Sequence, residues 1–519
     1  MAIQPAGKAV LFVLAAGVLV GGMFLVKSTG ALDKYIAPKG HQAGSGEIPK
    51  GAFKGAGAQS DVVKIGTVTW PGYAGGELYN GGFVPSTTSR YWTEQGIKVE
   101  FVNEDDVKAS REAWRTDHVQ IMWGTVDALP TEMNGLGQFK PRILFQADWS
   151  QGGDAIVAKG IIKSANDMVG KKIAFAEATP SHTFLLYALD AAGLNYSDIE
   201  PIIVNSAIEA AQAFRDGKCD LAVVWSPDDE DCVAKVPGAH ILMSSKDAQN
   251  IIADCFFAKD EWVQANKEIV NKIVKGWMIG AAEINSQDAS KHQAAEVLSV
   301  KLGGTSDTWY GMLGKVRVCT WGDNMRFFGL DQTWTGMTGE KLYTKMSKIY
   351  RMINYVRGDI PSWEQTAYTD AIQNLQGELG SDARSVAQGA KVYSAPTAQL
   401  ATKAAVSSKP ISITFTTGSA VLDDNAKQII EFKFADIMNM SSNRIRIEGN
   451  TDNTGSPDGN RALSRQRAQS VAGYLSSKFN VNGNRFVIVG NGADRPVADN
   501  STDMGRAKNR RTDFQLLSE

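Results

Sequence analysis

The chain has 519 residues, with 54 Lys and Arg against 56 Asp and Glu, which leaves a formal net charge of −2. This balance excludes the basic excess expected of a nucleic-acid-binding protein. The 43% hydrophobic and 21% charged residues exclude a mostly disordered chain, and the mean hydropathy of −0.20 excludes a protein with many membrane spans. At ~150 residues per domain, about three folded domains are expected.

The N-terminal segment predicts a membrane anchor. Residues 9–26 form an uncharged apolar run of 18 residues between two lysines. As a helix rising 1.5 Å per residue, the run spans roughly 27 Å, close to the ~30 Å hydrocarbon core of a bilayer. We therefore expect a cytoplasmic N-terminus over 1–8, a transmembrane helix over 9–27 and a flexible tether over 28–60. A cleaved signal peptide is the alternative.

Two features of this span concern its function. Gly17 and Gly21 have the GxxxG spacing that lets two helices approach closely, so a homodimer is one option. The span has no Asp or Glu, whereas a proton-driven motor subunit needs an ionisable carboxylate within the membrane.

From residue 61 to about 376, strand-like runs alternate with helical patterns. A β-rich run opens the region at 62–66, and helical spacing is clear over 182–193. The further strand-like runs are 97–102, 119–124, 155–160, 171–176, 199–204 and 220–225. Strands separated by helices predict a doubly wound α/β architecture, in which ligands bind at the carboxyl ends of the strands. Beyond residue 251 the pattern becomes mainly helical.

A second linker is expected over 377–410, which is rich in Ala, Ser, Gln and Lys and contains Pro396 and Pro410. The last unit, 411–519, alternates strand and helix patterns, ending in a strand near residues 512–517. It contains GNTDNTGSPDGNRALSRQRAQSVAGYL and then GNGADRPVADNSTDMGRAKNRRTDFQL. These stretches resemble the OmpA-like peptidoglycan-binding domain over about 110 residues. The TD-x-x-G-S, N-x-x-LS-x-x-RA-x-x-V and GR-x-x-NRR elements of that family stand here in order.

The resemblance implies a small α/β domain that binds the diaminopimelate residue of the peptidoglycan stem. The family's ligand-contacting Asp and Arg fall on Asp452 and Arg467. A zwitterionic ligand needs such a pair, because a carboxylate binds its ammonium and a planar guanidinium binds its carboxylate. The other positions that match the family's motif are Thr451, Asn460, Leu463, Asn509 and Arg510. A turn cap at Asp452 and a structural salt bridge at Arg467 are the alternative interpretation.

The central region resembles periplasmic substrate-binding proteins of the nitrate, sulfonate and taurine ABC transporter type. The similarity rests on DWSQGGDAIVAKG, VGKKIAFAEATPSHTFLLYALDAAGL and FRDGKCDLAVVWSP, and covers roughly 300 residues. It implies two α/β lobes that close on a small solute. The predicted fold is therefore α/β throughout: a two-lobed periplasmic-binding-protein fold over 61–376 and a smaller OmpA-like domain over 411–519, preceded by one transmembrane helix.

The solute site is expected in the loops at the strand ends. The candidate residues there are Trp70, Tyr73, Trp123, Thr125, Ser150, Asp154, Thr179, Ser181, His182, Trp225 and Asp228. The helix start at Thr179 could bind an anion, whereas aromatic side chains with carboxylates suit an amine. The charge of the solute therefore stays open. The aromatic residues could equally be core or lip residues, and the cleft could be an interaction surface that binds no solute.

No catalytic motif is present, and neither a cofactor nor a metal site is expected. The five histidines are scattered along the chain. The four cysteines, Cys219, Cys232, Cys255 and Cys319, contain no CxxC pair and leave their disulfide pairing open.

The sequence predicts a single-pass protein of the bacterial inner membrane with most of its chain in the periplasm. It would bind peptidoglycan and a small solute, and feed or sense for a membrane protein complex such as a transporter or motor. The alternatives are a structural stator subunit resembling MotB, and a wall tether whose central domain is a docking surface.

Overall fold

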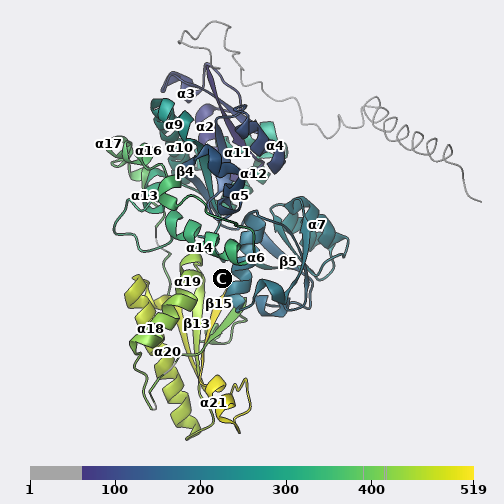
Figure 1. Cartoon of the computed structure of the whole chain (residues 1–519), viewed down its shortest axis with the longest axis vertical. Helices are drawn as coiled ribbons and strands as arrows, with labels where there is room; N and C mark the ends of the chain where they lie inside the picture. Colours follow the sequence, from purple (N-terminus) through teal and green to yellow (C-terminus); the bar gives the residue numbers. More distant parts are fainter. Residues whose placement is uncertain (1–60, 390, 414, 417, 519) are drawn as a thin grey trace, which may run out of the picture. The chain divides into compact units, whose positions relative to one another are not determined.

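The computed structural model describes residues 61–389, 391–413, 415–416 and 418–518. Three β-sheets, each covered by helices, organise these residues (Figure 1). We call the first two sheets with their helices lobe 1 and lobe 2, and the third the C-terminal domain. The described part of the chain is thus mixed α/β.

Lobe 1 contains a six-stranded sheet with the order β11-β4-β10-β3-β1-β2. Its strands are β1 (Val62–Thr67), β2 (Lys98–Asn103), β3 (Ile121–Thr125), β4 (Pro141–Ser150), β10 (Ala253–Lys259) and β11 (Val316–Val318). Its longer helices are α4 (Val107–Arg115), α5 (Leu129–Leu136), α10 (Lys267–Ser286), α11 (Asp288–Leu302) and α14 (Gly339–Met352). The three strands β1, β2 and β3 are parallel, whereas β10 runs antiparallel to both β3 and β4.

Lobe 2 contains a five-stranded sheet with the order β7-β6-β8-β5-β9. Its strands are β5 (Asp154–Ala158), β6 (Lys172–Ala176), β7 (Glu200–Val204), β8 (Leu221–Trp225) and β9 (His240–Ser244). Its helices include α6 (Pro180–Ala192), α7 (Ala207–Arg215) and α8 (Asp228–Lys235). The chain enters lobe 2 between β4 and β5 and returns between β9 and β10. Next to these crossings, β10 runs antiparallel to β4, and β5 runs antiparallel to β8. Neither sheet is therefore the purely parallel one that strand–helix alternation suggests.

The segment that follows Trp70 is fixed by a close helix contact. The turn η1 (Pro71–Tyr73) leads into α2 (Ala74–Asn80), which packs against α10. A Cβ atom on Gly280 would lie 2.0 Å from the carbonyl oxygen of Gly75, and one on Gly76 would lie 2.3 Å from the Trp277 ring. Only glycine at these positions lets the two helices approach so closely, and this contact holds η1 over the sheet.

The C-terminal domain contains a four-stranded sheet with the order β12-β15-β13-β14. The strands are β12 (Ser407–Ile411), β13 (Arg444–Asn450), β14 (Phe486–Gly492) and β15 (Thr512–Leu517), and the helices are α18 (Asp424–Ile430), α19 (Asp436–Met440), α20 (Pro457–Phe479) and α21 (Asp503–Asn509). The boundary expected at residue 411 falls inside β12, whose register with β15 pairs Ser407 with Leu516. The segment expected as a linker therefore contributes a sheet strand.

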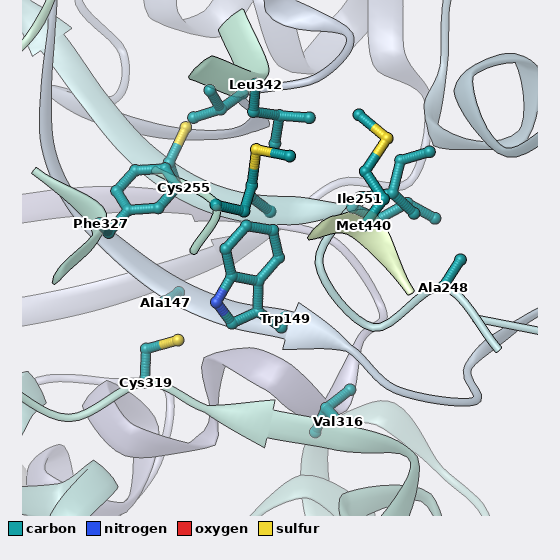
Figure 2. Close-up of a cluster of buried hydrophobic side chains, with 14 of the residues drawn as sticks. Ala147, Trp149, Ala248, Ile251, Cys255, Val316, Cys319, Phe327, Leu342 and Met440 are labelled. Carbon is teal, nitrogen blue, oxygen red and sulfur yellow. The ribbon is translucent and has the colours of Figure 1, made fainter. Parts of the chain in front are cut away.

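The core of lobe 1 is apolar and contains two of the cysteines. Figure 2 shows Trp149 of β4 among Leu342, Phe327 and neighbouring side chains, and the rings of Trp149 and Phe327 lie 5.8 Å apart. Cys255 and Cys319 lie in the same region (Figure 2). All four cysteines are free and buried. Burial raises the pKa of Cys219 and Cys232 to about 11, so these thiols stay protonated and act as small apolar side chains.

The predicted location as a single-pass inner-membrane protein is contradicted. Across the part of the chain that the structure describes, no helix combines the length and the apolar character that a membrane crossing requires. The predicted span 9–27 lies outside the described residues. So do the segment 1–8, the tether 28–60 and the Gly17 and Gly21 pair.

Candidate functional site

Aromatic and acidic side chains from both lobes enclose a cavity of about 20 Å³. Six of the candidates from the sequence line it: Trp70, Tyr73, Trp123, Thr125, Asp154 and Trp225. Val68, Pro180, Ile252 and Asp254 complete the lining. Because β3, β8 and β10 each bring one or more of these residues from a strand end or the adjoining loop, the cavity lies where the α/β pattern places a ligand.

The register of three strands brings the acids together. On β10, Asp254 lies opposite Thr125 of β3 and opposite Asp148 of β4. In lobe 2, Asp154 of β5 lies opposite Trp225 of β8. The rings of Trp70 and Trp225 approach edge to face at 6.4 Å, so one tryptophan from each lobe closes the cavity.

Each acid accepts a hydrogen bond from a neighbour. Tyr73 Oη donates to Asp254 Oδ1 at 2.7 Å, and Trp70 Nε1 donates to Asp148 Oδ2 at 2.9 Å. Ser150 Oγ donates to Asp154 Oδ2 at 2.6 Å. These bonds fix the carboxyl groups in position although they are almost completely removed from water.

Burial changes the protonation of these groups. It raises the pKa of Asp154 to about 7, and does the same for Asp127, which accepts a hydrogen bond from the Ala253 N–H at 3.2 Å. Burial also raises the pKa of Asp148 and Asp254 well above the usual range, and the charge of Asp148 adds to the effect on Asp254. These carboxyl groups lie together in one site that is shielded from water. Ionising all of them at once would be energetically costly.

Five of the solute-site candidates do not line the cavity. Ser150 is fully buried and, besides its bond to Asp154, contacts Ser245 Oγ at 2.8 Å, so it joins the two segments that connect the lobes. Thr179 Oγ1 donates to the Ala176 carbonyl at 2.8 Å just before α6, and Ser181 is fully buried in the first turn of that helix. Asp228 forms an ion pair with Arg215 at 2.9 Å, as a structural side chain would.

His182, the last of the five, is part of the core. Its ring is fully buried and lies 4.8 Å from the ring of Tyr355 and 5.2 Å from that of Tyr350. Burial lowers the pKa of His182 to about 3, so the imidazole is neutral at physiological pH. Its Nδ1 accepts the Ala178 N–H at 3.3 Å, which supports the turn into α6.

Three acids of the site were not among the candidates: Asp127, Asp148 and Asp254. Each is buried beside or within an apolar strand, where an acidic side chain is costly unless it has a purpose. An acid inside an apolar strand pattern, as in the run 251–258, is the sequence signal that points to them. Their convergence depends on strand pairing across more than a hundred residues.

The peptidoglycan-site candidates lie at the end of β13 and on α20. Asp452 Oδ2 accepts from Arg510 Nη1 at 2.6 Å, and Asp452 Oδ1 accepts from the Thr454 N–H at 3.0 Å. Burial acts to raise the pKa of Asp452, but the bonds to Arg510 and Thr454 outweigh it and hold the pKa below its usual value. Asp452 is therefore an anion at neutral pH.

Arg467 faces the same group. Its guanidinium stacks 4.8 Å from the Phe415 ring centre, and its Nε donates to the Ser419 carbonyl at 3.0 Å. Burial lowers the pKa of Arg467, the charge of Arg510 lowers it further, and Asp452 acts in the opposite direction. Since all three charges act on one another, one carboxylate and two guanidinium groups form a single cluster, in which the terminal nitrogens of Arg467 donate to no other described residue.

Of the remaining candidates, Asn460 supports the loop of this cluster. Asn460 Nδ2 donates to the carbonyls of Asp452 and Thr454 at 3.3 and 3.1 Å, which ties the loop to α20. Thr451 is 5% exposed and its Oγ1 has no hydrogen-bond partner among the described residues. Leu463 is half-buried on α20. A Cβ atom on Gly449 would lie 2.1 Å from the Ser464 carbonyl oxygen, so α20 crosses β13 at a glycine contact.

Asn509 is a buried side chain that bonds mainly to the protein's own backbone and is not exposed to a ligand. Its Oδ1 accepts the N–H groups of Val497 and Ala498 at 2.8 and 3.0 Å, and its Nδ2 donates to Ala498 O and Asn500 Oδ1 at 2.8 and 2.9 Å. The side chain is fully buried. It therefore holds the 497–500 loop against α21.

Replacing Asn509 with Ala should lower the stability of the C-terminal domain. The change removes four part-buried hydrogen bonds to the 497–500 loop, each worth about 0.5–1.5 kcal/mol net, so we expect a loss of about 2–4 kcal/mol. Calorimetry of the full chain measures this loss, and peptidoglycan binding below the melting temperature should persist. Lost binding with unchanged stability would instead make Asn509 a ligand contact.

Comparisons with known proteins match two parts of the chain. Residues 414–510 match the profile described as the OmpA family, and residues 150–288 match the one described as NMT1/THI5 like. Both are families of binding proteins. Outer membrane protein A of Bordetella avium is 31% identical over 155 residues, which are 30% of this chain and 74% of that protein.

Two further relatives match shorter stretches. Peptidoglycan-binding protein ArfA of Mycobacterium tuberculosis is 49% identical over 71 residues, 14% of this chain and 22% of ArfA. An Escherichia coli protein named for binding aliphatic sulfonates is 41% identical over 66 residues, 13% of this chain and 20% of its own length. The chain spans 30% and 22% of the first two curated relatives it matches.

Among solved structures, the periplasmic aliphatic sulphonate-binding protein SsuA from Escherichia coli is similar over 61% of this chain and 100% of its own. The identity is 17% and the TM-score is 0.47. A similarity at this level says nothing about the ligand of the present chain.

Proposed function

The chain belongs to the OmpA family through its C-terminal region, and we propose that it binds peptidoglycan there and a small solute in the cavity between its lobes. The observation that carries the first half is the cluster of Asp452, Arg467 and Arg510. It offers one anion and two cations to a ligand that carries both charges, as the free end of a diaminopimelate residue does. The relative ArfA is named as a peptidoglycan-binding protein, which agrees with peptidoglycan as the larger ligand.

The solute-binding half rests on the cavity and on the match of residues 150–288. Both lobes contribute side chains to the cavity, and two short segments connect the lobes, which is an arrangement suited to closing on a ligand. We further propose that solute binding serves a membrane protein complex. A receptor bound to the cell wall cannot diffuse away, so its local concentration near such a complex stays high. A homodimer through Gly17 and Gly21 remains a prediction from the sequence.

Co-sedimentation of the full chain with purified sacculi tests the wall-binding half. We expect the chain to sediment with sacculi whose stems contain diaminopimelate, and soluble diaminopimelate to release it, because the two compete for Asp452 and Arg467. Sacculi whose stems contain lysine lack the second zwitterionic end and serve as the control. Equal binding to both kinds of sacculi would contradict the proposed ligand.

A further inference from the structure

The cavity between the lobes is acidic. All the lining residues are among those that the structure describes. They include Asp154 and Asp254 but no Lys, Arg or His. Asp148 lies directly behind this wall, close enough that a Cβ atom on Gly72 would meet its Oδ2 at 1.4 Å. An anion entering here would meet carboxyl groups without a cationic side chain to oppose them.

The start of α6 does not compensate for this acidity. Pro180, the first helical residue, has no N–H group. Two of the following backbone N–H groups already have a partner: those of His182 and Thr183 both donate to the Thr179 carbonyl, at 3.0 and 3.2 Å. The helix terminus therefore lacks the set of free N–H groups that makes an anion site.

Two carboxyl oxygens at the site, Asp127 Oδ2 and Asp148 Oδ1, have no donor among the described residues. Both oxygens are buried, and Ser181 Oγ beside the cavity shares this condition. A buried acceptor without a partner is unfavourable, and a ligand that brings N–H donors relieves it. The free indole N–H of Trp225 is a single donor that a hydroxyl or carbonyl oxygen of the same ligand could accept.

The aromatic side chains favour the same ligand charge. Trp70, Tyr73, Trp123 and Trp225 all line the cavity, and such rings attract cations through their faces. Trp123 already does so on one face, where the Arg111 guanidinium lies 4.6 Å from the ring centre. That guanidinium is neutralised by two bonds to Glu132, at 2.5 and 3.0 Å, and so adds no net charge to the site.

We propose that the cavity binds a small organic ammonium ion. This inference rests on the proposed solute-binding function and names the class of solute. A metal ion is the other cation to consider, but within the described residues no three His, Cys, Asp or Glu side chains are placed to hold one. The volume of about 20 Å³ accommodates one or two water molecules, so the proposal requires the lobes to move apart for an ion larger than methylammonium.

Thermal unfolding of the full chain, followed by tryptophan fluorescence, tests the proposal with matched salts. Ethylammonium chloride, ethanolammonium chloride and choline chloride are compared with sodium ethanesulfonate, sodium nitrate and calcium chloride, with sodium chloride at equal ionic strength as the reference. All twelve tryptophans lie between Trp70 and Trp363, so the signal reports on the two lobes. We expect at least one ammonium salt to raise the melting temperature in a saturable way, and the anion and calcium arms to match the reference.

Asp148→Asn tests the charge itself. The amide keeps an oxygen for the Trp70 N–H but cannot ionise to a carboxylate when an ammonium ion binds, so we expect ammonium affinity to fall at least tenfold. Asp307→Asn, a change of the same kind at an exposed position on lobe 1, is the control and should bind like the parent. Trp225→Leu removes one aromatic face without touching a charge and should also weaken binding, which keeps the test valid if Asp148→Asn unfolds.

The possible failures separate the two proposals. Saturable stabilisation by ethanesulfonate, nitrate or calcium, with none by the ammonium salts, overturns the ammonium proposal and leaves solute binding standing. Stabilisation by ammonium salts that survives both Asp148→Asn and Trp225→Leu places the binding elsewhere and also overturns it. A chain that no salt stabilises overturns solute binding together with its ligand, and favours the central domain as a docking surface.

Discussion

Replacing Arg467 with Ala is expected to weaken binding to diaminopimelate-containing sacculi by roughly 10- to 100-fold. A guanidinium that holds a carboxylate forms charge-assisted hydrogen bonds worth about 1.5–3 kcal/mol, and each 1.4 kcal/mol corresponds to about tenfold in affinity. The buried position of Arg467 against Phe415 limits the competition from water and so preserves this energy. Titration of the full chain against sacculi, with the bound fraction read after sedimentation, measures the effect.

Two variants define the chemistry of that loss. Arg467→Lys keeps the charge but not the planar pair of donors, so its affinity should fall between those of the parent and Arg467→Ala. Arg465→Ala removes an exposed arginine from the same helix and should bind like the parent. If Arg465→Ala weakens binding as much as Arg467→Ala does, binding reflects the general positive charge of α20 rather than the proposed site.

Raising the pH from about 4 to about 8 is expected to lower the free energy of unfolding of the two lobes by several kcal/mol. Burial raises the pKa of Asp127 and Asp154 to about 7 in the folded chain, against about 4 for an unfolded one. A carboxyl whose folded pKa is raised binds its proton more tightly when folded. Its contribution to stability is complete below the unfolded pKa and is lost as the pH rises through the folded value.

Neighbouring carboxyls act in the same direction, whereas His182, whose folded pKa of about 3 lies below the unfolded value of about 6.5, opposes them as a single group. Burial also raises the pKa of Asp148 and Asp254 beside them, and the charge of Asp229 of α8 also acts on Asp154. Each pKa unit corresponds to about 1.4 kcal/mol, so several shifted groups produce a large total even after they are allowed to share protons. An ammonium ligand favours the ionised carboxylates, and its affinity should therefore increase over the same pH range.

Denaturant unfolding at pH 5, 6, 7 and 8, read by tryptophan fluorescence, measures this dependence. Asp154→Asn cannot ionise and still accepts from Ser150, so it should match the parent near pH 5 and exceed its stability at pH 8. The C-terminal domain contains no tryptophan and does not contribute to the signal. A parent whose stability stays level or rises between pH 5 and 8 would show that these acids ionise freely and that the cavity is wetter than the structure indicates.

The sequence alone predicted the α/β character of the chain and six residues of the cavity lining. It could do so because strand ends in α/β units follow from local patterns, and Trp70, Trp123 and Trp225 all stand at or next to such ends. The OmpA family membership was also accessible, since the spacing from Asp452 to Arg467 and on to Asn509 and Arg510 lies within one continuous domain. Local order along the chain was sufficient for each of these inferences.

Tertiary packing decided the rest, because burial and pairing depend on elements far apart in the sequence. Nothing near His182 in the sequence shows that Tyr350 and Tyr355 will enclose it, and nothing near Asp228 shows that Arg215 will neutralise it. The acidic wall of the cavity depends on the β4–β10 register, which brings Asp148 and Asp254 together across 106 residues. Only that register turns two isolated acids into one buried acidic site.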